Sequence, residues 1–333
     1  MKSVRIFTAT AAVAAALVAG PAQAALTSFS TVSGAGVNLS TSGCGSTTQA
    51  CTLSGNVPAG ATVVAAYLYS STFGGGTPSG GTLNGTALSP YTALGANNAG
   101  LQGYRTNVTA IVTAGLASNT TGNYSFRVTE TSTGQDGEAL VIIYNDGSST
   151  VNTVAILDGF SQTTGDSFGL GIEAFSATSS AEMRLGIGFS FDGTNCSGGN
   201  QTSQVTVNST KITNNAGCND DSIDANPANG NLITMGGDND PFSTLLPTVT
   251  LDHERYNLNP YIALNSTSIT VNTLNPSSDD NIFLAVFKLS GNATVCTGPD
   301  CNPNNDVPEP MSLALLGLAL AALGVQRKLA KRT

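Results

Sequence analysis

The chain has 333 residues with 12 basic and 21 acidic side chains, and its formal net charge is −9. Residues 25–306 contain 20 of the acidic and 6 of the basic side chains, so the formal charge of this part is −14. Nucleic acids and anionic membrane surfaces bind proteins through a basic face, and this composition excludes both as partners of the main part of the chain.

The N-terminal residues have the pattern of a secretory signal peptide. Lys2 and Arg5 form a basic start, residues 11–18 are apolar, and Ala22-Gln23-Ala24 supplies the small residues that signal peptidase requires. We therefore expect signal peptidase to remove residues 1–24 and the rest of the protein to be exported.

Four apolar runs predict the central strands of the exported part. They are continuous rather than alternating, which is typical of strands that are covered on both faces. The runs are residues 61–69, 139–144, 151–157 and 282–289.

Other segments alternate between apolar and polar residues, as strands with one buried and one solvent-exposed face do. In residues 181–192, the apolar side chains of Met183, Leu185 and Ile187 alternate with Arg184 and with glycines. We therefore expect Arg184 to face solvent. Residues 124–129 alternate in the same way.

Two local signals lie among these strands. Asn145-Asp146-Gly147 separates two apolar runs and predicts a β-hairpin, because these residue types tolerate the positive φ of tight turns. Residues 106–118 place apolar side chains on one side of a short helix.

Strand signals throughout, with no alternating helices, predict an all-β fold for residues 25–302. We expect an antiparallel β-sandwich, for which a jelly roll is one possible arrangement. The length allows one large domain or two small ones.

Part of this region resembles a module of unknown function in large bacterial surface proteins. The resemblance implies a β-sandwich at a cell surface and assigns no functional residue. It rests on Ala65-Ala66-Tyr67-Leu68-Tyr69, Arg105-Thr106-Asn107-Val108-Thr109 and Asp136-Gly137-Glu138-Ala139-Leu140-Val141.

All six cysteines lie in the exported part and fall into three local pairs. Export leads to an oxidising compartment, where disulfides form. A metal site is the alternative, but the spacings and the single histidine do not reproduce the paired C-x-x-C of a zinc site. The predicted disulfides are Cys44–Cys51, Cys196–Cys218 and Cys296–Cys301.

The C-terminal residues 303–333 combine a short motif, an apolar segment and a basic end. Val307-Pro308-Glu309-Pro310 precedes apolar residues 311–325, and Arg327 is the first of four basic residues that follow. As a helix, the apolar segment would be roughly 22 Å long at about 1.5 Å per residue, less than the ~30 Å of a bilayer core. It can hold the chain in the inner membrane during export, but it is short for a permanent span.

This order of features is similar to the PEP-CTERM sorting signal of Gram-negative bacteria, a tail also labelled the ice-binding protein C-terminal domain. The motif residues are Val307, Pro308, Glu309 and Pro310. The resemblance implies that an exosortase-like membrane protease removes the tail. It also implies a final location in the cell envelope or the extracellular matrix, where such proteins are associated with exopolysaccharide and biofilm.

A group of acidic residues late in the chain is a candidate calcium site. Closely spaced Asp and Asn oxygens on a loop suit calcium, which would relieve the mutual repulsion of the carboxylates. The spacing is not that of an EF-hand, and a solvated acidic loop is the alternative. The predicted ligands are Asp220, Asp221, Asp224, Asp238 and Asp240.

Two sets of residues could support catalysis. His253 is the only histidine, but no G-x-S-x-G motif accompanies it, so a solvent-exposed loop histidine is the simpler interpretation. A glycosidase needs two carboxylates across a sugar-binding cleft. Aromatic residues that stack on sugars make up only 6% of the chain, and tryptophan is absent. A hydrolase would require a pocket on which some of these residues converge: Glu130, Glu138, Glu173 and Glu182.

The sequence therefore predicts an exported, disulfide-bonded protein with a structural or adhesive role and no catalytic residue. An envelope polysaccharide hydrolase and a calcium-dependent carbohydrate-binding module are the alternatives. Apart from calcium we expect no cofactor. The expected partners are signal peptidase, an exosortase-like protease and exopolysaccharide.

Overall fold

A computed structural model describes eleven segments of the chain, between residues 25 and 298. The predicted signal peptide and the tail 303–333 lie outside them. The described segments are residues 25–45, 50–74, 77–78, 80–96, 100–131, 134–161, 163–188, 203–217, 233–248, 251–276 and 281–298.

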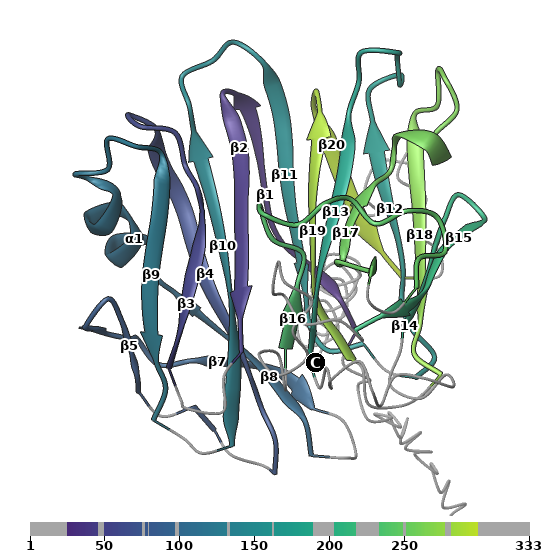
Figure 1. The fold of residues 1–333 in the computed structure, drawn as a ribbon. Helices are drawn as coiled ribbons and strands as arrows, with labels where there is room; N and C mark the ends of the chain where they lie inside the picture. Colours follow the sequence, from purple (N-terminus) through teal and green to yellow (C-terminus); the bar gives the residue numbers. More distant parts are fainter. Residues whose placement is uncertain are drawn as a thin grey trace, which may run out of the picture.

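The strands of these segments form four antiparallel sheets (Figure 1). Sheet 1 contains β3 (Ala50–Asn56), β9 (Asn123–Thr129), β5 (Thr82–Leu83) and β6 (Thr86–Ala87). Sheet 2 contains β2 (Val37–Cys44), β10 (Gln135–Asn145), β4 (Thr62–Thr72), β8 (Gln102–Asn107) and β7 (Thr92–Ala96). Sheet 3 contains β1 (Thr27–Ala35), β11 (Val151–Asp158), β19 (Asn281–Ser290), β13 (Ala181–Gly188) and β16 (Ile233–Met235), with β17 (Arg255–Asn257) also paired to β13. Sheet 4 contains β15 (Thr210–Ala216), β14 (Ser203–Val207), β18 (Ser268–Leu274), β12 (Ser167–Ile172) and β20 (Ala293–Thr297).

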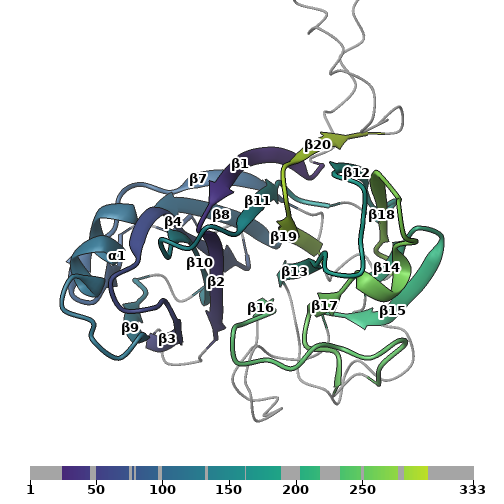
Figure 2. The same ribbon diagram turned by 90° about the horizontal axis from the view of Figure 1, so that it is seen from above.

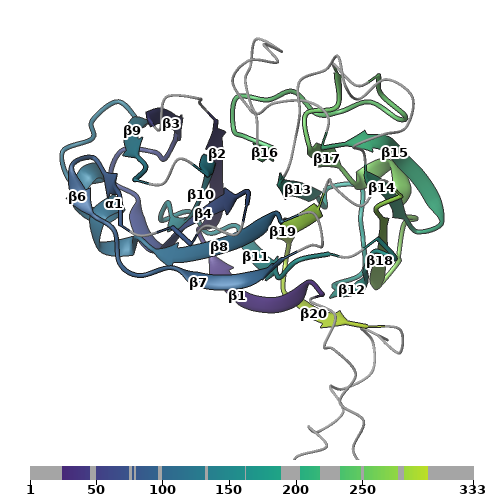
Figure 3. The ribbon, with the colours of Figure 1, turned by 90° about the horizontal axis from the view of Figure 1, so that it is seen from below.

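The four sheets are stacked in numerical order, with one hydrophobic core between each pair of neighbours (Figures 2 and 3). Phe126 of β9 and Leu140 of β10 belong to the core between sheets 1 and 2. Val141 of β10 and Val154 of β11 belong to the core between sheets 2 and 3. The third core lies between sheets 3 and 4. The expected all-β sandwich is therefore confirmed, and its two inner sheets are covered on both faces.

The continuous apolar runs become the inner strands of sheets 2 and 3. In β10, Val141 and Ile143 point into one core while Leu140 and Ile142 point into the other. The other runs form β4, β11 and β19, each of which has a paired strand on both sides. The prediction of central strands for these four runs is confirmed, because only a strand with two buried faces needs an apolar residue at every position.

The predicted hairpin at Asn145-Asp146-Gly147 is wrong. The segment is a turn, but β10 pairs with β2 and β4, whereas β11 pairs with β1 and β19. The chain passes there from sheet 2 to sheet 3, beside the opposite passage at Gly36. Gly36 N–H donates to Thr150 O (2.9 Å), and a Cβ at Gly36, where φ is +75°, would lie only 2.6 Å from Asn145 Oδ1.

The expected solvent-facing side of β13 is also wrong. Arg184 is only 3% exposed, because sheet 2 and the segment after β16 cover it. By contrast, β9 alternates as predicted, with Tyr124 and Phe126 buried and Arg127 exposed.

The expected short helix is α1 (Thr109–Leu116), which packs its Val112 into the core between sheets 1 and 2. A single 3₁₀ turn, η2, covers Asn259–Tyr261. In the segments that the structure describes, no helix is long and apolar enough to cross a membrane. The predicted apolar helix at 311–325 lies outside these segments.

Candidate functional site

A buried ion pair joins sheet 3 to sheet 2. Arg184 Nη1 of β13 donates to Asp238 Oδ1 (2.5 Å), which follows β16, and to Thr41 Oγ1 of β2 (2.6 Å). The side chain of Arg184 is 4% exposed and that of Asp238 is 14% exposed. Both charges are therefore largely removed from water, and each depends on the other.

Asp238 also accepts hydrogen bonds from two further strands. Its carboxylate receives the Thr41 amide (3.2 Å) and the Ser40 hydroxyl, both on β2, and the Asn56 amide at the end of β3 (3.1 Å). Because these donors lie on sheets 2 and 1, one carboxylate contacts three layers of the fold.

A second arginine extends this set of contacts. Glu182 Oε1 accepts from both Arg184 Nε (2.7 Å) and Arg255 Nε (2.8 Å), while Arg255 Nη1 donates to the carbonyl oxygen of Asp240 (2.7 Å). Burial alone would raise the pKa of Glu182, but the two guanidinium groups together lower it. We call Arg184, Asp238, Glu182, Arg255 and Thr41 the Arg184 network.

Two of the five predicted calcium ligands are described, and both are engaged by protein groups. Asp238 belongs to the Arg184 network, and Asp240 Oδ2 accepts the Gly237 amide (2.6 Å). Within the described segments, no three His, Cys, Asp or Glu side chains are grouped as metal ligands would be. Asp220, Asp221 and Asp224 lie outside these segments, so calcium binding by the full set stays a prediction.

The segment around His253 is buried, contrary to the expectation of an exposed loop. His253 is 8% exposed, and its neighbours Asp252 and Glu254 are completely buried. Burial lowers the pKa of His253. Asp252 accepts from the hydroxyls of Tyr256 (2.7 Å) and Ser243 (3.1 Å), which fix the position of its carboxylate.

Glu254 is held in the same way, with no base among its described contacts. It accepts the Gly217 amide (3.0 Å) and the Thr234 hydroxyl (3.0 Å). Burial, together with the charges of Asp252 and Asp240, raises the pKa of Glu254 well above its ordinary value. Burial raises the pKa of Asp252 as well.

A third polar site lies inside the sandwich of sheets 1 and 2. Glu138 at the start of β10 is completely buried, and Gln135 is 1% exposed. Gln135 Nε2 donates to Glu138 Oε1 (2.6 Å) and to Ser70 Oγ of β4 (2.9 Å). Glu130, 6% exposed, accepts the Gly137 amide at Oε1 (3.0 Å).

Several oxygens of this site accept no hydrogen bond from the chain. They are Glu138 Oε2, Gln135 Oε1 and the hydroxyl of Tyr91. Burial and the charge of Glu130 raise the pKa of Glu138 well above its ordinary value. Burial and the charge of Glu138 likewise raise the pKa of Tyr91. We call Ser70, Tyr91, Glu130, Gln135 and Glu138 the Glu138 cluster.

The four carboxylates considered for a hydrolase are therefore only partly brought together. Glu130 and Glu138 meet in the Glu138 cluster, whereas Glu182 belongs to the Arg184 network. Glu173 is exposed and accepts the Asn292 amide (3.0 Å), which lowers its pKa.

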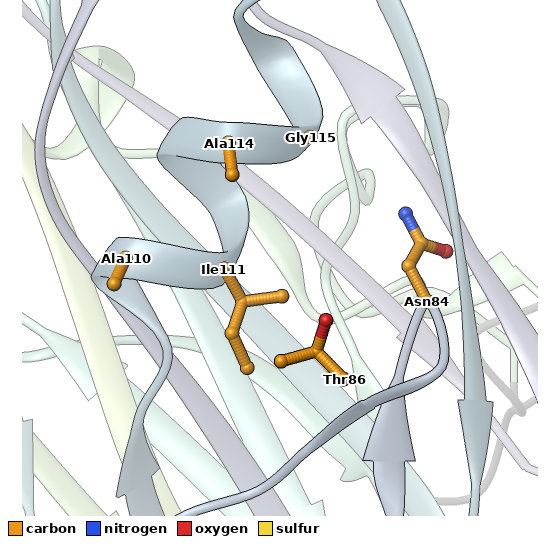
Figure 4. A pocket seen from close by; sticks show the side chains of 6 residues that line it. All are labelled: Asn84, Thr86, Ala110, Ile111, Ala114 and Gly115. Atoms are coloured by element: carbon orange, nitrogen blue, oxygen red, sulfur yellow. The ribbon is translucent and has the colours of Figure 1, made fainter.

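Pockets lie at other places on the surface. One of about 330 Å³ is formed between α1 and the β5–β6 turn (Figure 4). Its lining contains no acid, base or thiol: Asn84, Thr86, Ala110, Ile111, Ala114 and Gly115. Another, of about 510 Å³, lies where the two ends of the described chain meet, and its lining includes Ala25, Asp166, Thr297 and Gly298.

The described cysteines are all in disulfides. Cys44 of β2 is bonded to Cys51 of β3, which links sheet 2 to sheet 1. Cys296 of β20 is disulfide-bonded as well. Cys196, Cys218 and Cys301 lie outside the described segments, so the other two predicted pairings stay predictions.

The sequence contained weak signals for the partners of these buried groups. Arg184 is one of two charged residues in an otherwise apolar strand, and Glu138 directly precedes the apolar run of β10. A charged residue at a buried position of a strand indicates a partner in space. The positions of those partners, Asp238 and Glu130, depend on tertiary structure and carried no local signal.

Comparison with protein families gives a match at the C-terminal end of the chain. Residues 306–328 match the PEP-CTERM protein-sorting motif, which implies export and sorting by an exosortase-like system. The chain therefore carries a PEP-CTERM sorting signal, as its terminal residues indicated.

No curated protein sequence matches the chain. A peptide-N(4)-(N-acetyl-β-D-glucosaminyl) asparagine amidase is similar over 80% of this chain and 99% of its own, with 12% identity and a TM-score of 0.25. The major capsid protein P2 of bacteriophage PM2 is similar over 76% and 97%, with 11% identity and a TM-score of 0.18. At such TM-scores neither similarity bears on the function of this chain.

Proposed function

We propose that the protein is a structural or adhesive component of the cell envelope or extracellular matrix, delivered there by an exosortase-like protease. The PEP-CTERM motif at residues 306–328 is the observation that carries this proposal. The N-terminal signal pattern supports it, because sorting by the tail requires prior export of the body.

The body supports a structural role through the use of its charged residues. Arg184 and Asp238 connect sheet 3 to sheets 2 and 1. The disulfide between Cys44 and Cys51 joins sheet 2 to sheet 1. Such cross-links between layers favour a rigid body that persists outside the cell.

The hydrolase alternative is weakened by the burial of its best acid pair. Glycoside hydrolysis requires both carboxylates to reach the scissile bond. Glu138 is completely buried and Glu130 is 6% exposed, so a polysaccharide does not reach them in this conformation. A polysaccharide is instead the expected binding partner of the outer surface.

The sorting step is tested by intact mass of the extracellular protein from a fractionated culture of the host. We expect a species that begins near residue 25 and has lost the residues after the Pro308-Glu309-Pro310 motif. The variant with Pro308→Ala and Pro310→Ala should keep its tail and stay with the membrane fraction. Pro303→Ala, the same change outside the motif, should be processed normally.

The location is tested by fractionating the same culture with and without its polysaccharide layer. A matrix component should leave the cell-associated fraction when the layer is removed. An extracellular species that retains residues 311–333 would contradict the sorting proposal, and a distribution that ignores the polysaccharide layer would contradict the matrix role.

A further inference from the structure

At one end of the core between sheets 1 and 2, the buried side chains are polar instead of apolar. Leu140 and Ile142 of β10 point into this core, and Glu138 occupies the next position of the same face. Leu68 of β4 is followed on its face by Ser70, which is paired with Glu138 across the strands. The Glu138 cluster is therefore an extension of the core, enclosed by the same two sheets.

The hydrogen bonds of the cluster leave two buried acceptor oxygens without a donor. Gln135 Nε2 donates to Ser70 Oγ and to Glu138 Oε1, and the Gly137 amide donates to Glu130 Oε1. Glu138 Oε2 and Gln135 Oε1 accept nothing from the chain, although both residues are almost completely buried. An unpartnered buried acceptor destabilises the fold, and a charged one does so more strongly, so two in one place call for a ligand.

The electrostatic environment of the cluster is negative. In the described segments, the charged group that acts on Glu138 is Glu130, another carboxylate. Tyr91 faces both of these carboxylates. A positive ligand would relieve the repulsion between the two acids and accept the free oxygen lone pairs at the same time.

We propose that the Glu138 cluster binds one calcium ion. Its carboxylate oxygens come from Glu130 and Glu138, the amide oxygen from Gln135, and hydroxyl oxygens from Ser70 and Tyr91. Calcium takes six to eight oxygen ligands in flexible geometry, with carboxylates, amide carbonyls and waters among them. The cluster offers neither the sulfur nor the imidazole ligands that zinc prefers.

The framework around the cluster is already fixed by covalent and backbone bonds. Glu138 is paired with Cys44 on one side and with Ser70 on the other, and Cys44 is bonded to Cys51 of sheet 1. Glu138 on β10 and Glu130 directly after β9 therefore belong to the strands that pair with the two strands joined by the disulfide. The ion would join β9 and β10, and so sheet 1 to sheet 2, at the end of their shared core.

This site differs from the acidic loop predicted from the sequence. It uses none of the residues Asp220, Asp221, Asp224, Asp238 and Asp240. Asp238 is paired with Arg184, so removal of the Asp238 carboxylate would destabilise the fold with or without calcium.

The test uses the purified exported protein with calcium chloride or with a chelator. Calorimetric titration should give one calcium ion per chain. At a hundredfold excess of calcium over its dissociation constant, the melting temperature should rise by roughly 5–10 °C relative to chelator.

Glu138→Gln is the decisive variant, because it removes one charge without changing the side-chain shape. Its new amide N–H groups can donate to Gln135 Oε1 and to Glu130, so the variant should fold and should melt higher than the wild type in chelator. It should show no shift with calcium. Glu130→Gln, which keeps Glu138, should weaken calcium binding at least tenfold.

Two controls separate this site from other acidic groups. Glu173→Gln changes an exposed glutamate and should keep the full calcium shift. The double variant Asp220→Asn with Asp221→Asn should also keep it. A wild-type melting temperature that calcium leaves unmoved overturns the proposal, and so does an equal calcium shift in Glu138→Gln. A shift that Asp220→Asn with Asp221→Asn abolishes would place the calcium in the acidic loop and overturn the proposal as well.

Discussion

Arg184 and Asp238 form an ion pair of 2.5 Å that holds three layers of the fold together. Arg184 lies on sheet 3, and the carboxylate of Asp238 accepts hydrogen bonds from β2 of sheet 2 and from the end of β3 of sheet 1. Sheets 1, 2 and 3 are therefore held together by a buried ion pair as well as by hydrophobic contacts. A hydrophobic interface alone tolerates small displacements, whereas this ion pair fixes the relative position of the strands.

Replacement of Arg184 by methionine should strongly destabilise the protein. The substitution leaves Asp238 buried without its counter-charge, which typically costs about 3–5 kcal/mol. Chemical denaturation at neutral pH measures the free energy of unfolding. Arg127→Met, an identical change on the exposed face of β9, should stay within about 0.5 kcal/mol of the wild type. Similar losses in the two variants would show that the ion pair contributes nothing special.

The buried pair Asp252 and Glu254 should make stability depend on pH. Both folded pKa values are raised above those of the unfolded chain. The stability from such groups is fully present below the unfolded pKa of about 4 and is lost as pH rises through the folded pKa. Asp252→Asn should therefore be more favourable relative to the wild type at pH 7 than at pH 5. The difference should be about 1.4 kcal/mol for each unit by which the folded pKa lies above 5, up to the two-unit span of the measurement.

The comparison between these two chains reports on Asp252 and Glu254 together, because the charge of Asp252 also raises the pKa of Glu254. His253, whose lowered pKa gives a slope of the opposite sign, is present in both. Asp146→Asn is the control, because the pKa of this exposed carboxylate is lowered and it stays ionised in both states between pH 5 and 7. Urea unfolding at the two pH values gives the required free energies. A pH-independent effect of Asp252→Asn would mean that the buried pair does not hold its extra proton.

Consecutive residues of β10 should be equally sensitive to truncation. Ile142 and Ile143 are both completely buried, in different cores, so Ile142→Ala and Ile143→Ala should each cost about 2–5 kcal/mol. In β9, only one of two neighbours should matter: Phe126→Ala should cost about 3–5 kcal/mol and Arg127→Ala little. Thermal or urea unfolding of the four variants decides this. A tolerated Ile143→Ala would contradict the packing of sheet 2 on sheet 3.

Loss of the disulfide between sheets 1 and 2 should be measurable but not fatal. Cys44 and Cys51 are seven residues apart, and closing so short a loop stabilises the folded state by about 2.5 kcal/mol in the chain-entropy model. The double variant Cys44→Ala with Cys51→Ala should lose about this amount in denaturant unfolding. Peptide mapping without reductant checks all three predicted pairs at once, and a free thiol at Cys196, Cys218 or Cys301 would refute the local pairing.

The fold class could be predicted from the sequence because burial on one or two faces leaves a direct pattern along a strand. β9 alternates, and β10 is continuously apolar, as their positions in an outer and an inner sheet require. The partner of β10 could not be predicted. Asn145-Asp146-Gly147 specifies a local turn of the backbone, and a turn does not determine whether the next strand stays in the same sheet or joins another.

The candidate sites were harder to predict than the strands. Glu130 and Glu138 were correctly singled out as carboxylates that could meet, since both lie in or beside strand segments. Arg184 was expected in solvent, because its neighbours alternate in the manner of a one-sided strand. Arg184 is covered by segments that contain Thr41 and Asp238, which are distant in sequence. No local pattern around Arg184 predicts these contacts.

The two ends of the described body meet at one corner of the molecule. Ala25, where the chain enters β1, and Gly298, which follows β20, line the same pocket. A molecule tethered to a membrane through either end is therefore suspended from the same corner. In the proposed export intermediate, release of the first tether would leave the body attached at that corner, and the side with β3, β9, β16 and β17 would still face away from it (Figures 2 and 3).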